Sequence, residues 1–127
     1  MKNHLNFRTL AFYSFFGMLV FFTYLLNILI VPILPENELS VVEGQVTHIY
    51  EAGHQDVCFR LKGHENSYYI NRGLENGLSL EVLKERLLGE TVTIKHPEYM
   101  MIKYAKSVHL SILRHEDETL FDETPAT

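Results

Sequence analysis

Cysteine and tryptophan are nearly missing from this 127-residue chain, which has one Cys and no Trp. A single cysteine cannot form a disulfide within the chain, so an apolar core has to hold the fold. The alternation through residues 56–62 predicts that Cys58 is a small, half-covered thiol on the face opposite Val57 and Phe59. A disulfide to another chain is the alternative, and redox catalysis is disfavoured because there is no C-x-x-C motif.

Charge is missing from a long apolar run near the N-terminus. No Asp, Glu, Lys or Arg occurs from Thr9 to Pro35, and residues 10–34 read LAFYSFFGMLVFFTYLLNILIVPIL. As a helix these residues would be about 37 Å long, enough to cross a hydrocarbon layer of roughly 30 Å. The apolar region of a cleaved signal peptide is shorter and ends in a small-residue site, which VPILPENEL does not offer. The run therefore predicts one transmembrane helix within residues 9–35, acting as an uncleaved, single-pass signal anchor.

The flanks of this run differ in charge. Lys2 and Arg8 precede it, whereas Glu36, Glu38 and Glu43 follow it. Lys and Arg are retained on the cytoplasmic side of a membrane. We therefore expect residues 1–8 to be a cytoplasmic flank of the cytoplasmic (inner) membrane, with the C-terminal domain periplasmic or extracellular.

Positive charge is scarce after the apolar run. Residues 36–127 contain nine Lys and Arg against sixteen Asp and Glu, a formal balance of −7. Nucleic-acid binding needs clustered positive charge, so it is disfavoured, as is docking on anionic lipid headgroups. No nucleic acid is expected among the partners.

Residues 36–122 have the pattern of a small, mainly-β domain, and residues 123–127 that of a frayed tail. Period-two alternation and turn signals predict strands over 39–51, 56–62, 67–70, 91–96 and 106–113, a helix over 79–88, and a sixth short strand within 114–123. This order of elements, with a helix between the third and fourth strands, is that of the oligonucleotide/oligosaccharide-binding (OB) barrel. Closure of the barrel removes the sheet edges. An open α+β sheet is the alternative.

The same alternation predicts the core of this domain. Ser79 is the expected N-cap of the helix and Gly89 its stop. The inward side chains of the helix and strands are predicted to be Val57, Phe59, Leu61, Leu83, Leu87, Val92, Ile94, Val108, Leu110 and Ile112.

Enzyme motifs are also missing. The chain has no nucleophile elbow, no glycine-rich phosphate loop and no H-E-x-x-H. The acidic run from Glu116 to Glu118 is most simply a solvated turn. We therefore expect no cofactor and no catalysis, and an enzyme acting on envelope glycans has no support from particular residues.

Large apolar side chains are concentrated where a polar turn would be expected. The stretch HPEYMMIKY, residues 96–104, carries Tyr99, Met100, Met101, Ile102 and Tyr104. Aromatic residues and Met are enriched in the cores of protein interfaces. These five residues are therefore predicted to bind a partner, either another envelope protein or a second copy of the chain, in an accessory role within an envelope complex. The alternative is that Ile102 and Tyr104 fold under the mouth of the barrel.

A copper-type carrier is a second hypothesis. In a barrel of this kind His54 would approach His96, Met100 and Met101. Imidazole and thioether are soft ligands suited to Cu(I). The same barrel face could instead carry another small ligand.

The anchor-plus-barrel layout resembles that of the haem chaperones of cytochrome c maturation. Those proteins attach haem through a His that is followed four residues later by a Tyr. Here His96 and Tyr99 are three positions apart, so the resemblance covers the layout and does not imply haem binding.

Overall fold

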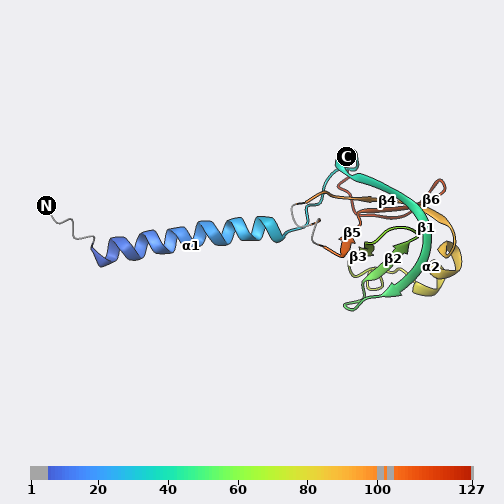
Figure 1. The fold of residues 1–127 in the computed structure, drawn as a ribbon, viewed down its shortest axis with the longest axis horizontal. Helices are drawn as coiled ribbons and strands as arrows, with labels where there is room; N and C mark the ends of the chain where they lie inside the picture. The colour runs from blue at the N-terminus through green and yellow to red at the C-terminus, as the bar shows by residue number, and fades with distance from the viewer. Residues whose placement is uncertain (1–5, 100–101, 103–104, 127) are drawn as a thin grey trace. The chain divides into compact units, whose positions relative to one another are not determined.

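The computed structural model describes residues 6–99, 102 and 105–126. The chain divides into two compact units, Met1–Ile30 and Val31–Thr127, which are drawn in Figure 1. Of the predicted site residues, Met100, Met101 and Tyr104 lie outside the described residues.

In the described residues of the first unit, 6–30, there is one helix, α1, Phe7–Leu29. It is long and apolar enough to cross a membrane, with a mean hydropathy of 1.8. Two of its polar side chains form hydrogen bonds within the helix: Thr23 Oγ1 donates to Leu19 O at 2.9 Å, and Asn27 Nδ2 donates to Thr23 O at 2.8 Å. The helix ends at Leu29, five residues before the end of the apolar run. Pro32 is the cause, because it disfavours helical backbone at the residue before it and cannot itself donate a backbone hydrogen bond.

The second unit is a mainly-β domain, as the sequence predicts. Its elements are η1 Glu36–Glu38, β1 Ser40–Glu51, β2 Val57–Leu61, β3 Ser67–Ile70, α2 Leu80–Leu87, β4 Thr91–His96, β5 Ser107–His109, β6 Ile112–His115 and β7 Glu118–Asp122. The strands form one mixed sheet in the order β5-β3-β2-β1-β4-β6-β7, in which only β3 and β5 are parallel. By the pairing of the described residues, β5 and β7 are its two edges, so the sheet is not the closed five- or six-stranded barrel that the sequence predicts.

The long strand β1 connects the two halves of the sheet, and Figure 1 shows its curvature. Its first half, Ser40 to Gln45, pairs with β4, and its second half, Val46 to Glu51, pairs with β2. Leu61 passes so close to Gly44 that an added Cβ would lie 3.1 Å from the Leu61 side chain. A side chain at position 44 would therefore require the Leu61 side chain to shift by a few tenths of an ångström, next to the point where β1 changes partners.

Helix α2 has the ends that the sequence predicts. The Ser79 side chain accepts a hydrogen bond from Val82 N at 3.4 Å, and Gly89 follows the helix with φ +83°. The helix buries Leu83 and Leu87 against the sheet.

The core agrees closely with the prediction. All ten side chains predicted to point inward are buried, and Phe59 is fully so. The core cluster also contains residues that the sequence analysis does not name: Val46, Ile49, Tyr68, Ile70 and Leu113. Ile112 is buried outside this cluster, and Leu113 takes the inward position instead.

The expected last long strand is broken at Leu110 and Ser111. Leu110 N donates to Tyr69 O on β3 at 3.0 Å, whereas Ser111 N donates to Lys95 O on β4 at 2.8 Å. Consecutive amides thus bond to two strands that are separated by β2 and β1 in the sheet order.

An ion cluster fixes the start of the domain to the sheet. Glu36 Oε1 accepts from Lys95 Nζ on β4 at 2.6 Å and from Arg114 Nη1 on β6 at 2.7 Å. These hydrogen bonds, from Arg114 and then Lys95, lower the pKa of Glu36 from 4.5 to about 2.

Replacing Phe59 with Ala should lower the free energy of unfolding by about 3–5 kcal/mol, because it leaves a cavity in a fully buried site. Val41, which is exposed on β1, provides the control, and Val41→Ala should change stability by no more than about 0.5 kcal/mol. Urea denaturation followed by circular dichroism measures both. Equal midpoints for Phe59→Ala and the wild type would contradict the packing.

Replacing Glu36 with Gln should lower the Tm in a pH-dependent way. A carboxylate whose folded pKa is depressed stabilises the fold above its unfolded pKa, and this contribution disappears as pH falls through the folded pKa. The Tm difference should thus be complete at about pH 6, shrink between pH 4.5 and about 2, and be absent below that range. A difference that does not vary with pH would show that the ion cluster is not its cause.

Candidate functional site

On the side of the sheet that faces away from the core, four neighbouring strands carry two aligned rows of side chains, which we call the β2–β3 face; Cys58, Ser67 and His109 within it are buried. Strand register places Tyr50 beside Cys58, Cys58 beside Tyr69, and Tyr69 beside His109. The second row, in the same strand order, consists of His48, Arg60, Ser67 and Ser107. Alternating inward residues of the same strands fill the core, so the face consists of the polar and aromatic half of each strand.

A hollow of about 450 Å³ lies at one end of this face. It is lined by Ala52, Asp56, Cys58, Tyr69, Asn71 and Ser107. The β1–β2 turn therefore forms one wall, and β3 and β5 form the others.

Two carboxyl groups lie near the hollow. Burial is the largest cause of the raised pKa of Tyr69, and the titratable groups of Tyr99, Asp56, Cys58 and Glu123 raise it further; of these four, only Asp56 and Glu123 are carboxylates. Burial, followed by the charge of Asp56, raises the pKa of Cys58 from 9.0 to about 11. Cys58 is therefore a neutral thiol at physiological pH.

Cys58 is more deeply covered than the sequence predicts. It is a free cysteine and only 2% exposed, so the expectation of a half-covered thiol is wrong. The neighbours Tyr50 and Tyr69 on the flanking strands account for this, because large cross-strand side chains enclose a small one. A buried thiol with a raised pKa is inert, which disfavours a redox role.

The described part of the 96–104 stretch is packed against the domain. Ile102 packs against the core, and Pro97 is buried. Tyr99 is half-buried with a pKa raised by burial, an effect opposed by a hydrogen bond from the backbone of His109. Tyr99 thus lies at the His109 end of the β2–β3 face. Whether the whole stretch binds a partner remains a prediction.

The histidines of the copper hypothesis are not brought together. His54 lies exposed in the turn beyond Glu51, at one end of β1, whereas His96 pairs with Ser40 at the other end. His96 is buried next to Tyr68, with ring centroids 6.0 Å apart. In the part of the chain that the structure describes, no group of three or more His, Cys, Asp or Glu could hold a metal ion.

A buried polar cluster at the end of β5 is not predicted by the sequence pattern. His109 Nε2 lies 2.5 Å from Glu123 Oε1, which also accepts from Ser111 Oγ at 3.0 Å. His109 is 9% exposed, whereas a solvated imidazole is the default expectation for a polar strand residue. No local signal reveals the cluster, because Glu123 belongs to the predicted frayed tail.

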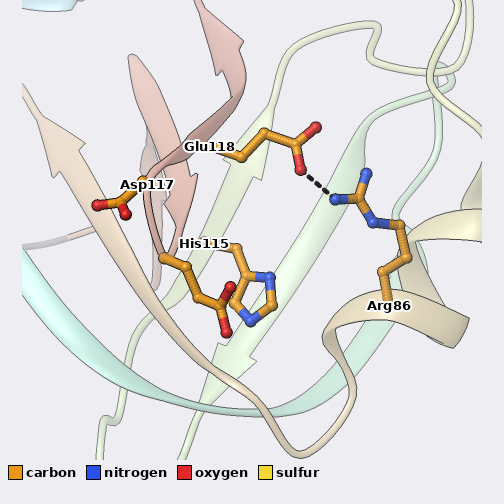
Figure 2. Close-up of a pocket in the computed structure, with 5 residues that line it drawn as sticks. Arg86, His115, Asp117 and Glu118 are labelled. Atoms are coloured by element: carbon orange, nitrogen blue, oxygen red, sulfur yellow. Dashed lines mark hydrogen bonds and ion pairs between the residues drawn. The ribbon is translucent and has the colours of Figure 1, made fainter.

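A second and larger depression, about 540 Å³, lies at the β6–β7 turn. Figure 2 shows Arg86 of α2 and Glu118 pointing toward each other in an ion pair, with Asp117 turned away. His115 Nε2 is 3.6 Å from Glu90 Oε2. Glu116, Asp117 and Glu118 are all exposed, as expected of a solvated turn. The Arg86–Glu118 ion pair in this depression therefore connects the turn to α2. The β2–β3 face is the better candidate site.

No known protein-family model matches the chain, and no curated protein is significantly similar to it.

Cys58 should react with a thiol reagent at least about 100-fold more slowly in the folded chain than in urea, because a pKa raised from 9.0 to about 11 lowers the thiolate fraction by that factor at neutral pH. The chain has no other cysteine, so the kinetics of the colour change with a disulfide reagent report on this thiol alone. Equal rates with and without urea would contradict the burial.

Proposed function

We propose that the chain is a single-pass, membrane-anchored and non-enzymatic binding module, an accessory component of an envelope complex that contacts another envelope protein through the β2–β3 face and Tyr99. The observation that carries the proposal is the alignment of two rows of polar and aromatic side chains across four strands. Tyr and Arg are enriched among the residues that dominate interface energies, and Tyr50 and Arg60 are exposed on this face.

The anchor in this proposal is α1. Its length and hydropathy suit a membrane span. Lys2 and Arg8 before the helix and the glutamates after it favour a cytoplasmic N-terminus and an external β domain. The acidic balance of this domain is unsuited to anionic membrane surfaces, which favours a protein partner over a lipid surface.

We further propose that the β domain, whose sheet is not closed, is a partly open, OB-like barrel with β7 as an extension. The support is the passage through Leu110 and Ser111, whose amides bond to β3 and to β4. The segment from Ser107 to His115 therefore pairs with β3 through β5 and with β4 through β6. The fifth strand of an OB barrel likewise pairs with two strands that are distant from each other in the sheet. In that fold the face of strands two and three, with its flanking loops, is the usual binding surface.

Binding without catalysis agrees with the chemistry of the face. The Cys58 thiol is neutral, and His109 is engaged by Glu123. Neither group is arranged as an activated nucleophile with a base.

A small-ligand carrier is the second candidate. The hollow of about 450 Å³ falls within the range of about 300–1,000 Å³ typical of ligand pockets. His54 follows one end of β1 and His96 pairs with the other end, so the structure gives no support to a copper version of this function.

The binding proposal predicts the behaviour of a double variant. Tyr50→Ser/Arg60→Ser should reduce recovery of a stoichiometric envelope partner at least about tenfold, because exposed anchor residues carry much of an interface's energy. Pull-down of the full-length chain in mild detergent, with quantitative mass spectrometry, measures this.

Val82→Ser, on the exposed side of α2, is the control and should leave recovery unchanged. Equal loss in the two variants, or wild-type recovery in both, would exclude the β2–β3 face as the contact surface. Absence of any stoichiometric partner would favour the small-ligand carrier.

A further inference from the structure

Asp56 is a half-buried carboxylate in the wall of the hollow. Its Oδ1 accepts a hydrogen bond from Arg72 N at 2.8 Å. The Arg72 side chain turns to Glu75 instead, with Nε 3.6 Å from Oε2. Among the described residues no cationic side chain forms an ion pair with Asp56, and a carboxylate keeps several lone pairs beyond one accepted bond.

The other walls of the hollow suit an organic cation. Tyr69 offers an aromatic ring, and Ser107 and Asn71 offer oxygen acceptors. Asp56 and Glu123 both raise the pKa of Tyr69, so their negative potentials overlap at its ring. A cation over the face of an aromatic ring gains further attraction from the ring quadrupole.

Other ligand classes fit the hollow less well. The residues that line it include no Lys or Arg, so an anion would meet Asp56 without a counter-charge. A soft metal would need a thiolate, and Cys58 is held neutral by its burial. Arg60 and His48 lie on the same face but do not line the hollow.

We infer that the hollow is a recognition pocket for a guanidinium group, and that an arginine side chain of the partner protein fills it. A planar guanidinium can stack on Tyr69 while it donates to Asp56 and Ser107, which a compact ammonium group does less well. This inference rests on the proposed function, because it assigns the chemistry by which the β2–β3 face reads its partner.

The test is an amide NMR titration of the full-length chain in neutral detergent micelles. The probe is acetyl-glycyl-arginyl-glycinamide, and the matched control replaces arginine with citrulline, which has the same shape and no charge. The arginine peptide should shift the amides of Tyr69, Asn71 and Ser107 saturably. The citrulline peptide should bind at least about tenfold more weakly, because a charge-assisted hydrogen bond is lost.

Two variants complete the test. Asp56→Asn keeps the oxygen that accepts from Arg72 N but removes the charge, and should weaken the arginine peptide at least about tenfold. Asp117→Asn, in the exposed β6–β7 turn, should leave its affinity unchanged.

Three results would overturn the inference: no saturable shift with the arginine peptide, equal affinity for citrulline, or unchanged affinity in Asp56→Asn. The proposed function fails separately. If the partner is still captured by Asp56→Asn but lost in Tyr50→Ser/Arg60→Ser, the face binds its partner without reading an arginine.

Discussion

The passage of the chain through Leu110 and Ser111 is the constraint on which the rest of the domain depends. Two consecutive amides bond to different strands, so β5 is fixed beside β3 and β6 beside β4. Ser111 is fully buried there, and Glu123 satisfies its hydroxyl. Without this passage Ser107 and His109 would not complete the two rows of the β2–β3 face, and the hollow would lack a wall.

Much of the fold could be predicted from the sequence because its strongest signals are local. Alternating residues mark β2 and β4, and Ser79 and Gly89 mark the ends of α2. The break after β5 could not be predicted in this way. Val108, Leu110 and Ile112 continue a perfect alternation, yet Leu113 points into the core. Since Ile112 and Leu113 are both apolar and both buried, a change of phase between them leaves no trace in the pattern.

The candidate site could be predicted only in part. Tyr99 stands out in the sequence because a large aromatic side chain in a turn is unusual, and it does lie at one end of the β2–β3 face. The rows themselves depend on register between strands that are distant in sequence, as with Tyr69 and His109. The alternation in the sequence predicts which polar or aromatic residues of a strand point outward. It does not predict which residue of the next strand lies beside each of them.

Charge links the fold to the proposed way of binding. Several cations of the β domain are held in internal ion pairs: Lys95 and Arg114 by Glu36, Arg86 by Glu118, and Arg72 by Glu75. These pairs lie at the domain start, at the β6–β7 turn and in the loop after β3, and they leave the overall balance of −7 unchanged. A basic partner would therefore be attracted over several ångströms by the whole domain before any contact forms. Attraction of this kind speeds encounter without selecting an orientation. In the inference drawn above, the selection comes from Asp56, a half-buried carboxylate in the hollow at the end of the β2–β3 face.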